Sequence, residues 1–237
     1  MGKYELLTFG DDKQLAQTAA TRWLERLAAL SGKNAFLVAL SGGRIARTFF
    51  TATTILGNPK KSLFDLVHFF WGDERCVPPD DPESNYRIAQ ELLFTPLTIP
   101  ASQIHRIRGE EIPESAAKSA EQDLLKTAAT NPGSIPVFDL VFLGMGEDGH
   151  VASLFPGDNP PAGKEAVYRF VRGSKPPPNR ITLSYSAISA ARDVWVLASG
   201  AGKEDALRDS LKPDASTPLG CVLQRRERTL ILTDIRV

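Results

Sequence analysis

The stretch FDLVFLGMGEDGH, residues 138–150, joins a mainly apolar run to a loop of glycines and charged residues. A nearly continuous apolar run of this length is typical of a strand in a parallel sheet that is buried on both faces. In open parallel sheets, ligands bind beyond the carboxyl ends of the strands, which is where this loop would lie. The stretch therefore predicts a buried strand at 138–143 followed by a functional loop.

Two earlier segments repeat this pattern of an apolar run followed by glycine and charge. AFLVAL at 35–40 precedes SGGR at 41–44, and FDLVHFFW at 64–71 precedes GDER at 72–75. Glycines and charges are costly at the ends of buried strands unless the backbone has to approach a ligand. Because parallel strands end at a common edge, we expect the three loops to form one site.

The remaining chain alternates strand and helix patterns, which favours βαβ units and an α/β fold with a largely parallel sheet. Helical spacing of apolar residues, capping residues and prolines predict helices at 12–30, 45–57, 84–94, 114–129 and 203–211. Further strands are predicted at 4–9, 167–171, 180–184, 194–199 and 229–233. No Pro-rich stretch resembles a long interdomain linker, so residues 1–237 are predicted to form a single domain, with room for a small subsidiary lobe.

The composition is that of an ordinary globular protein, with 28 basic and 28 acidic residues among 237 and 42% hydrophobic residues. The lack of a basic excess argues against nucleic acid and anionic membrane surfaces as partners. The N-terminal residues lack the apolar core of a signal peptide, no apolar run reaches roughly 18 residues, and two cysteines provide no disulfide framework. We therefore expect a cytoplasmic protein with no membrane, nucleic-acid or obligate protein partner.

Residues 144–149 (GMGEDG) match the G-x-G-x-x-G pattern of dinucleotide-binding loops. The two acids of this segment, however, put negative charge where a pyrophosphate would lie. Pro156 also leaves little room for the helix that would face the phosphates. The Gly-Lys-Ser/Thr pattern of nucleoside triphosphatases is absent. The sequence thus favours neither a nicotinamide cofactor nor a nucleotide.

The Asp148-Gly149-His150 sequence fits an acid–base unit better. Histidine ionises near neutral pH, and a neighbouring carboxylate can hold its ring in one tautomer. The other two histidines fit structural roles, since His68 lies within a strand pattern and His105 lies in a short segment with no evident partner. We therefore predict that His150 is the functional histidine.

Asp73 and Glu74 admit three interpretations: a general base, a solvated turn or, together with His150, a metal site. Arg75, which follows them, either binds an anion or pairs with the two acids. No spacing of His, Cys, Asp or Glu matches a metal-ligand pattern, so no metal is expected.

Three further positions along the chain are typical of anion-binding sites. Ser41-Gly42-Gly43 leads from a strand into a helix, where backbone N–H groups bind anions. Arg180 follows a Pro-rich stretch at the start of a strand, and Lys203 opens a helix behind residues 200–202 (GAG). We predict that these groups form one phosphate clamp.

Long blocks of the chain resemble 6-phosphogluconolactonases. Residues 138–157 (FDLVFLGMGEDGHVASLFPG) resemble the signature of that family, and residues 67–94 resemble its second block. PPPNRITLSYSAI at 176–188 and GKEDAL at 202–207 match later blocks in the same order. The resemblance implies a modified Rossmann-like fold with helices on both faces of the sheet. It also implies hydrolysis of 6-phosphogluconolactone, a step of the oxidative pentose phosphate pathway, without a cofactor.

The same resemblance implies roles for individual residues. His150 would be the catalytic base and Asp148 its support. The residues implied to bind the substrate and its phosphate are Ser41, Gly42, Gly43, Arg44, Asp73, Arg75, Arg180 and Lys203. Ile45-Ala46 departs from the usual Thr-Pro of the family, which removes a threonine hydroxyl from the phosphate, and Arg44 is expected to compensate.

Glucosamine-6-phosphate deaminases are related in fold and share the DE and DGH elements. They typically continue DGHIAFNEPG and favour DEY, whereas this chain has DGHVASLFPG at 148–157 and DER at 73–75. Both differences favour the lactonase. A deaminase or isomerase, and a sugar-phosphate-binding module without turnover, remain the alternatives.

Overall fold

A six-stranded parallel sheet forms the centre of the computed structural model, which describes residues 4–30, 34–130, 134–158 and 165–236. The strand order is β1-β9-β8-β5-β2-β3, and every neighbouring pair is parallel. The strands are β1 (Tyr4–Thr8), β2 (Phe36–Leu40), β3 (Val67–Trp71), β5 (Leu140–Gly144), β8 (Asp193–Ala198) and β9 (Thr229–Thr233). The predicted α/β fold with a largely parallel sheet is confirmed.

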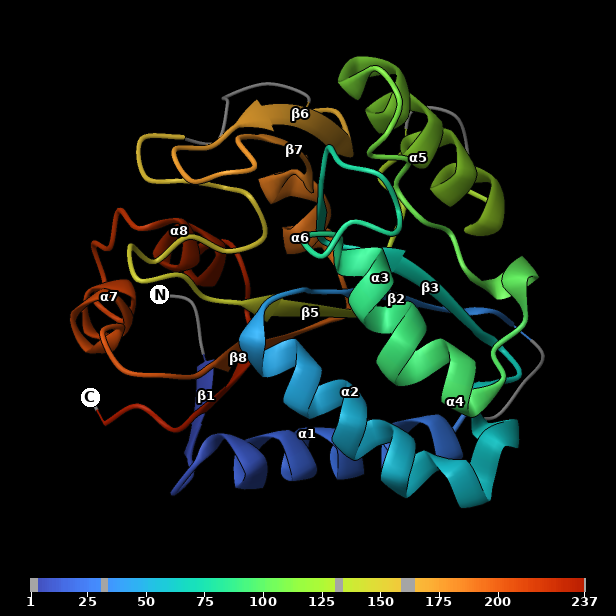
Figure 1. The fold of residues 1–237 in the computed structure, drawn as a ribbon. Helices are drawn as coiled ribbons and strands as arrows, with labels where there is room; N and C mark the ends of the chain where they lie inside the picture. The colour runs from blue at the N-terminus through green and yellow to red at the C-terminus, as the bar shows by residue number, and fades with distance from the viewer. Residues whose placement is uncertain (1–3, 31–33, 131–133, 159–164, 237) are drawn as a thin grey trace.

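Helices cover both faces of this sheet (Figure 1). Helices α1 and α2 lie on one face, and α5, α6 and α8 lie on the other. The helices are α1 (Asp12–Ala28), α2 (Arg44–Gly57), α3 (Asn85–Ala89), α4 (Thr95–Leu97), α5 (Pro113–Thr127), α6 (Tyr185–Ala190), α7 (Glu204–Ser210) and α8 (Pro218–Gln224).

The helix predictions are confirmed. The helix predicted at 84–94 runs on through α4, and its hydrogen bonding becomes π-helical at Gln90–Phe94, between α3 and α4. Helices α6 and α8, which are only 6 and 7 residues long, were not predicted from the sequence. Helices this short show too few turns for a periodic apolar pattern, although Ser184 and Thr217 cap them as expected of N-cap residues.

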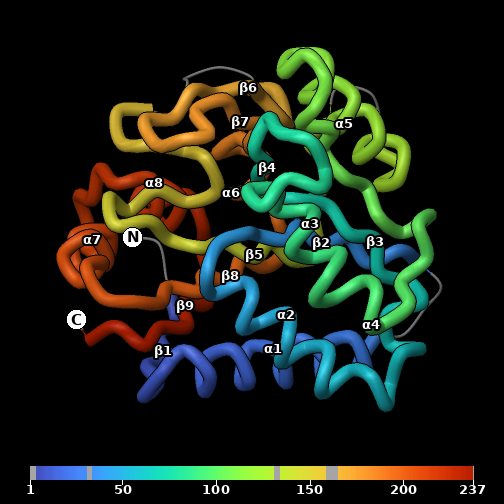
Figure 2. Tube along the Cα trace, viewed as in Figure 1, coloured from blue at the N-terminus to red at the C-terminus, as the bar shows by residue number. Residues whose placement is uncertain are grey.

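A second, three-stranded sheet lies beside the main one (Figure 2). It has the order β4-β7-β6 and consists of β4 (Asp73–Arg75), β6 (Tyr168–Arg172) and β7 (Asn179–Leu183) in antiparallel pairs. The strands predicted at 167–171 and 180–184 therefore exist, but outside the parallel sheet. The chain enters this small sheet at Gly72, directly after β3, so residues 73–75 start at the carboxyl edge of the main sheet.

Aromatic packing joins α1 and α2 to the sheet. The fully buried Trp23 on α1 contacts Phe49 of α2, Phe142 of β5 and Phe69 of β3, with ring centroids 5.7, 5.2 and 6.4 Å away. Such pairs add specific edge-on contacts to the large apolar area that each ring buries. This packing fixes the start of α2 relative to the carboxyl ends of the strands.

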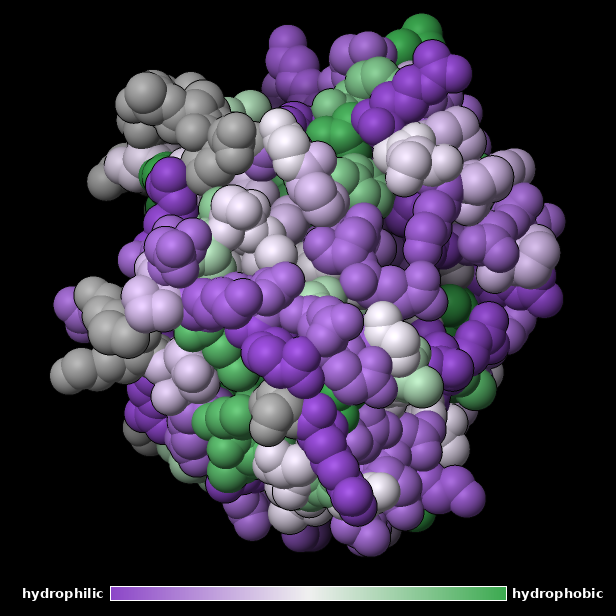
Figure 3. Space-filling model, turned by 90° about the vertical axis from the view of Figure 1, so that its left-hand side faces the viewer, coloured by the Kyte–Doolittle hydropathy of each residue, from purple (hydrophilic) through white to green (hydrophobic). Residues whose placement is uncertain are grey.

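The face shown in Figure 3 is mostly hydrophilic, and its apolar side chains form small, separate areas. This distribution is usual for a chain whose large apolar side chains lie in the core. Within the ranges that the structure describes, no helix has the length and apolar character needed to cross a membrane.

Glu74 on β4 caps helix α3. Its Oε1 accepts the backbone N–H groups of Arg75 and Asn85, both at 2.8 Å. Its Oε2 accepts the N–H of Tyr86 at 2.8 Å and the hydroxyl of Ser84 at 3.1 Å. The carboxylate is buried and both oxygens are fully used. The interpretation of Glu74 as a general base or metal ligand is therefore wrong, because the N-terminal N–H groups of α3 require its oxygens.

We expect Glu74→Gln to lower the free energy of unfolding by about 1–3 kcal/mol at pH 5, because its amide N–H would face backbone N–H donors and leave one unpaired. Burial raises the pKa of Glu74 to about 7, although three backbone N–H groups oppose this rise. Between these two pKa values the folded protein keeps the proton on Glu74 whereas the unfolded chain releases it, so rising pH favours unfolding of the wild type. The difference in the free energy of unfolding between the wild type and Glu74→Gln should therefore shrink between about pH 4.5 and 7.

Urea unfolding of both proteins across this pH interval measures the difference. Glu114→Gln is a matched control, since Glu114 lies exposed in the first turn of α5, and it should stay within about 0.5 kcal/mol of the wild type. If the difference in the free energy of unfolding instead grew with pH, the hydrogen bonds to Glu74 would lower its pKa by more than burial raises it.

Candidate active site

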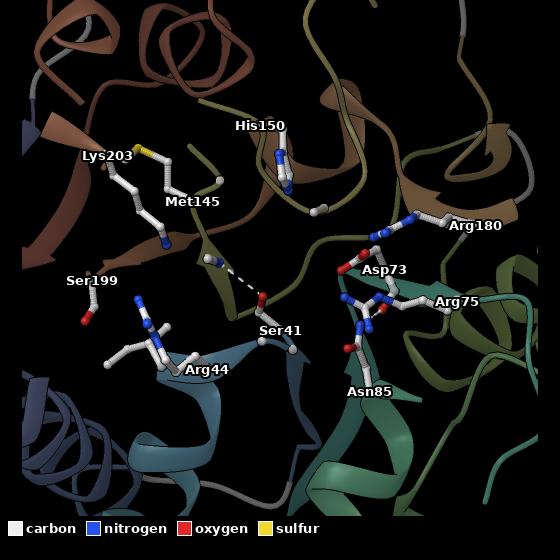
Figure 4. Close-up of a pocket in the computed structure, with 16 residues that line it drawn as sticks. Ser41, Arg44, Asp73, Arg75, Asn85, Met145, His150, Arg180, Ser199 and Lys203 are labelled. Carbon is white, nitrogen blue, oxygen red and sulfur yellow. Dashed lines mark hydrogen bonds between the residues drawn. The ribbon is translucent and has the colours of Figure 1, made fainter. Parts of the chain in front are cut away.

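A pocket lies at the carboxyl ends of β2, β5 and β8 and extends to the small sheet (Figure 4). Its lining includes nine of the ten residues predicted from the sequence: Ser41, Gly42, Gly43, Arg44, Asp73, Arg75, His150, Arg180 and Lys203. The tenth, Asp148, does not line the pocket but contacts the ring of His150. The common edge of the parallel strands thus brings the three predicted loops together.

His150 and Asp148 are in direct contact. Nδ1 of His150 lies 2.5 Å from Oδ1 of Asp148, and the same oxygen accepts the backbone N–H of His150 at 3.2 Å. Burial alone would raise the pKa of Asp148, but its hydrogen bonds with His150 hold that pKa below the ordinary value. An ionised Asp148 favours the tautomer with the hydrogen on Nδ1, which leaves Nε2 as the basic nitrogen. Nε2 forms no hydrogen bond with the residues that the structure describes.

A tight loop over residues 144–151 sets the direction of this ring. The N–H of Gly146 donates to the carbonyl of His150 at 2.9 Å. A methyl group on Gly146 would lie 2.1 Å from Cε1 and Nδ1 of His150, so only glycine lets the ring lie this close. The N–H of Leu219, in α8, donates to the carbonyl of Gly149 at 3.0 Å and fixes the loop from outside. No helix follows the loop between residues 147 and 158, as expected for a G-x-G-x-x-G segment without a dinucleotide site.

One side of the pocket contains the start of α2. Gly43 precedes the helix with a φ of 86°, which favours glycine, and no side chain caps the first turn. Ser41 Oγ accepts the N–H of Gly144 at 3.1 Å, which joins this loop to the end of β5. Arg44 and Lys203 extend into the same side of the pocket (Figure 4). Burial, and then the charge of Arg44, lowers the pKa of Lys203. This side therefore presents two cations and the N-terminal N–H groups of a helix.

The opposite side, at the small sheet, contains a second pair of cations. Arg75 and Arg180 lie opposite each other in the β4–β7 ladder. Nη1 of Arg75 donates to the carbonyl of Glu83 at 2.6 Å and pairs with its Oε2 at 3.4 Å. Asp73 is buried between the small sheet and the segment that contains His150 and Ser153, named here the histidine loop. Its Oδ2 accepts the hydroxyl of Ser153 at 2.6 Å.

The structure separates the predicted clamp of Ser41, Arg180 and Lys203. Lys203 lies beside Arg44, whereas Arg180 lies across the pocket beside Arg75, with His150 between the two pairs (Figure 4). Sequence position alone could not assign the cations to sides, because β7 belongs to the small sheet and α7 follows a strand of the main one.

Five lining side chains were not among the site residues predicted from the sequence: Ile45, Asn85, Met145, Ala152 and Ser199. Asn85 donates from Nδ2 to the carbonyl of Asp73 at 2.9 Å. Its only sequence signal is its place directly after the helix-capping Ser84. Ser199 lies at the end of a predicted strand, which is the position that identified the other loops, and its hydroxyl donates to Asp234 at 2.8 Å.

Within the described parts of the chain, no three His, Cys, Asp or Glu side chains are arranged to hold a metal ion. Asp73 is bound by Ser153, and Glu74 by the end of α3. The metal interpretation of Asp73, Glu74 and His150 therefore finds no ligand set among these residues.

Comparison with known proteins extends over almost the whole chain. Residues 10–231 match the family described as glucosamine-6-phosphate isomerases/6-phosphogluconolactonase. The 6-phosphogluconolactonase of Streptomyces coelicolor is 33% identical over 241 residues, covering 97% of this chain and 92% of that protein. The 6-phosphogluconolactonase of Mycobacterium tuberculosis is 36% identical over 239 residues, covering 95% and 94%.

Solved structures show the same similarity in three dimensions. The 6-phosphogluconolactonase from Trypanosoma cruzi superposes with a TM-score of 0.85 at 27% identity, covering 98% of this chain and 96% of that chain. The enzyme from Thermotoga maritima gives a TM-score of 0.78 at 29% identity, covering 97% and 98%. By sequence and by fold, the chain belongs to the glucosamine-6-phosphate isomerase/6-phosphogluconolactonase family.

Proposed function

We propose that this protein hydrolyses 6-phosphoglucono-1,5-lactone to 6-phosphogluconate. The observation that carries the proposal is the free Nε2 of His150, which is oriented by Asp148 and lies in a pocket with cations on two sides. The similar proteins from Streptomyces coelicolor and Mycobacterium tuberculosis, which match nearly the full chain, are 6-phosphogluconolactonases. A general base and an anion site together are what a phosphorylated lactone requires.

The phosphate is assigned to the side of the pocket with Arg44, Lys203 and the start of α2. Uncapped N–H groups at the start of a helix bind anions, and Gly43 allows the backbone to approach a ligand closely. Arg44 is the first residue of α2, so its charge adds to that of the helix terminus. Ile45 has no hydroxyl to offer, and the two side-chain cations supply the charge-assisted hydrogen bonds.

Hydrolysis then proceeds by attack of water on C1 of the lactone. Nε2 of His150 takes a proton from the water as its oxygen bonds to C1, and the carbonyl oxygen becomes an oxyanion. When the oxyanion collapses, the bond between C1 and the ring oxygen breaks, and imidazolium returns the proton to that oxygen. The product acid ionises and releases one proton to solvent. Asp148 stabilises the imidazolium and keeps the ring in the required tautomer.

The deaminase and binding-module alternatives predict different chemistry from the same pocket. An amino-sugar deaminase releases ammonia from glucosamine 6-phosphate, and a binding module releases nothing. The direct test is the hydrolysis of 6-phosphogluconolactone by the purified protein, followed by acid release and corrected for the spontaneous rate. A rate equal to the spontaneous one, at saturating lactone, would reject the proposal.

His150→Asn is expected to lower turnover by about 10²–10⁴-fold while the protein stays folded, because asparagine cannot accept the proton from water. Turnover and melting temperature of the same preparation measure the two effects.

His105→Asn is the matched control for this prediction. His105 lies outside the pocket, and its ring nitrogens contact Asp123 at 2.8 Å and His68 at 2.9 Å. Its replacement should lower the melting temperature and leave turnover unchanged. If His150→Asn retained near wild-type turnover, the base would have to be another group of the pocket, with Asp73 the first candidate.

Chelation is expected to leave activity unchanged, because the acidic side chains at the pocket are already bound by Ser153 and α3. Turnover measured before and after treatment with EDTA and gel filtration checks this expectation. Loss of activity that a single divalent ion restores would contradict the mechanism above.

A further inference from the structure

Arg180 is a buried cation without a carboxylate partner. The residue is 6% exposed, and its Nε donates to the carbonyl of Pro177 at 3.1 Å. Nη2 lies 3.5 Å from the carbonyl of Lys175, and Nη1 has no hydrogen bond with any residue in the described ranges. No carboxylate of those residues lies within ion-pair distance of Arg180. Burial and the like charge of Arg75 lower the pKa of Arg180, and the more distant carboxylates of Asp73, Glu83 and Glu74 offset this only in part. Burying an unpaired charge is costly, so this arrangement favours binding of an anion.

Phe155 packs against both the ring of His150 and the guanidinium of Arg180. The Phe155 ring lies 5.1 Å from the ring of His150, measured between centroids. The same ring lies 5.8 Å from Cζ of Arg180. Arg180 and His150 therefore share one aromatic neighbour, whereas Arg44 and Lys203 lie on the other side of the pocket (Figure 4).

We propose that Arg180, supported by Arg75, binds the carbonyl end of the substrate rather than its phosphate. It would stabilise the oxyanion at C1 during hydrolysis and then bind the carboxylate of the product. This inference rests on the proposed lactonase function. It differs from the clamp predicted from the sequence, in which Arg180 and Lys203 bind the same phosphate.

The chemistry of the reaction supports this division. Hydrolysis converts an uncharged ester into an oxyanion and then into a carboxylate, so negative charge develops at C1 only after water attacks. A fixed cation beside that atom stabilises the transition state more than the ground state. A guanidinium can also donate two parallel hydrogen bonds to a carboxylate. Arg44 and Lys203 meet the phosphate, whose charge does not change during the reaction.

Calorimetric titration with two ligands separates the two ends of the substrate. The ligands are 6-phosphogluconate and sorbitol 6-phosphate, which has a CH₂OH group in place of the carboxylate. Arg180→Met should lower the affinity for 6-phosphogluconate by about 10- to 100-fold, because a charge-assisted hydrogen bond is lost. The affinity for sorbitol 6-phosphate should stay unchanged within error. Lys203→Met, which also removes one cation from the pocket, should lower the affinity for both ligands by the same factor.

Two results would overturn the inference. If Arg180→Met lowered the affinity for both ligands equally, Arg180 would be a phosphate ligand. If it lowered neither affinity, Arg180 would have a purely structural role. Arg180→Lys keeps the charge but loses the two parallel N–H donors of the guanidinium, and it provides a second variant if the methionine variant fails to fold. It should lower the affinity for 6-phosphogluconate alone, and by a smaller factor than Arg180→Met does. Because these titrations involve no turnover, they are independent of the hydrolysis assay that tests the proposed function.

Discussion

The parallel pairing of β2, β5 and β8 is the constraint on which the site depends. Strand β5 pairs with β2 on one side and β8 on the other, so their carboxyl ends meet at one edge. Each of the three following loops contributes a different group: the free N–H groups of α2, the imidazole of His150 and the ammonium of Lys203. The hydrogen bond from Gly144 to Ser41 joins two of these loops directly. Without this common edge, groups more than a hundred residues apart in the chain would not share one pocket.

The small antiparallel sheet supplies what the parallel sheet lacks. Because β4 starts directly after β3, it brings Asp73 and Arg75 to the same edge, and its pairing with β7 adds Arg180. Ser153 then attaches the histidine loop to both strands, through its hydroxyl to Asp73 at 2.6 Å and its N–H to the Thr182 hydroxyl at 3.1 Å. The distance between His150 and the second pair of cations is thus set by buried hydrogen bonds, which are costly to break.

The pocket is electropositive although the chain has no formal net charge. Its lining contains Arg44, Arg75, Arg180 and Lys203 against the single carboxylate of Asp73. Charges interact more strongly in a partly buried pocket than in water, so a few residues determine which ligands are attracted. Two separate pairs of cations suit a substrate that is anionic at one end and becomes anionic at the other during the reaction.

The sequence by itself determined the features that depend on local order. The apolar runs at 35–40 and 138–143 specify buried parallel strands, because a strand covered on both faces needs apolar residues throughout. Asp148 and His150 lie two residues apart, so their contact requires only a tight loop, which the glycines permit. Nine of the ten predicted site residues line the pocket for the same reason, since each lies next to the end of a predicted element.

Tertiary structure alone decided how these groups are distributed. From the sequence, Glu74 could have been a general base or a metal ligand, but both oxygens bind the start of α3, which lies 11 residues further along the chain. Strands β6 and β7 have ordinary strand patterns, and only their partner β4 places them outside the parallel sheet. Arg180 and Lys203 look alike in sequence, yet they lie on opposite sides of His150. The reason is physical: residue type and local spacing specify a strand, a turn or a cap, whereas the partner of a buried charge depends on which distant segment packs against it.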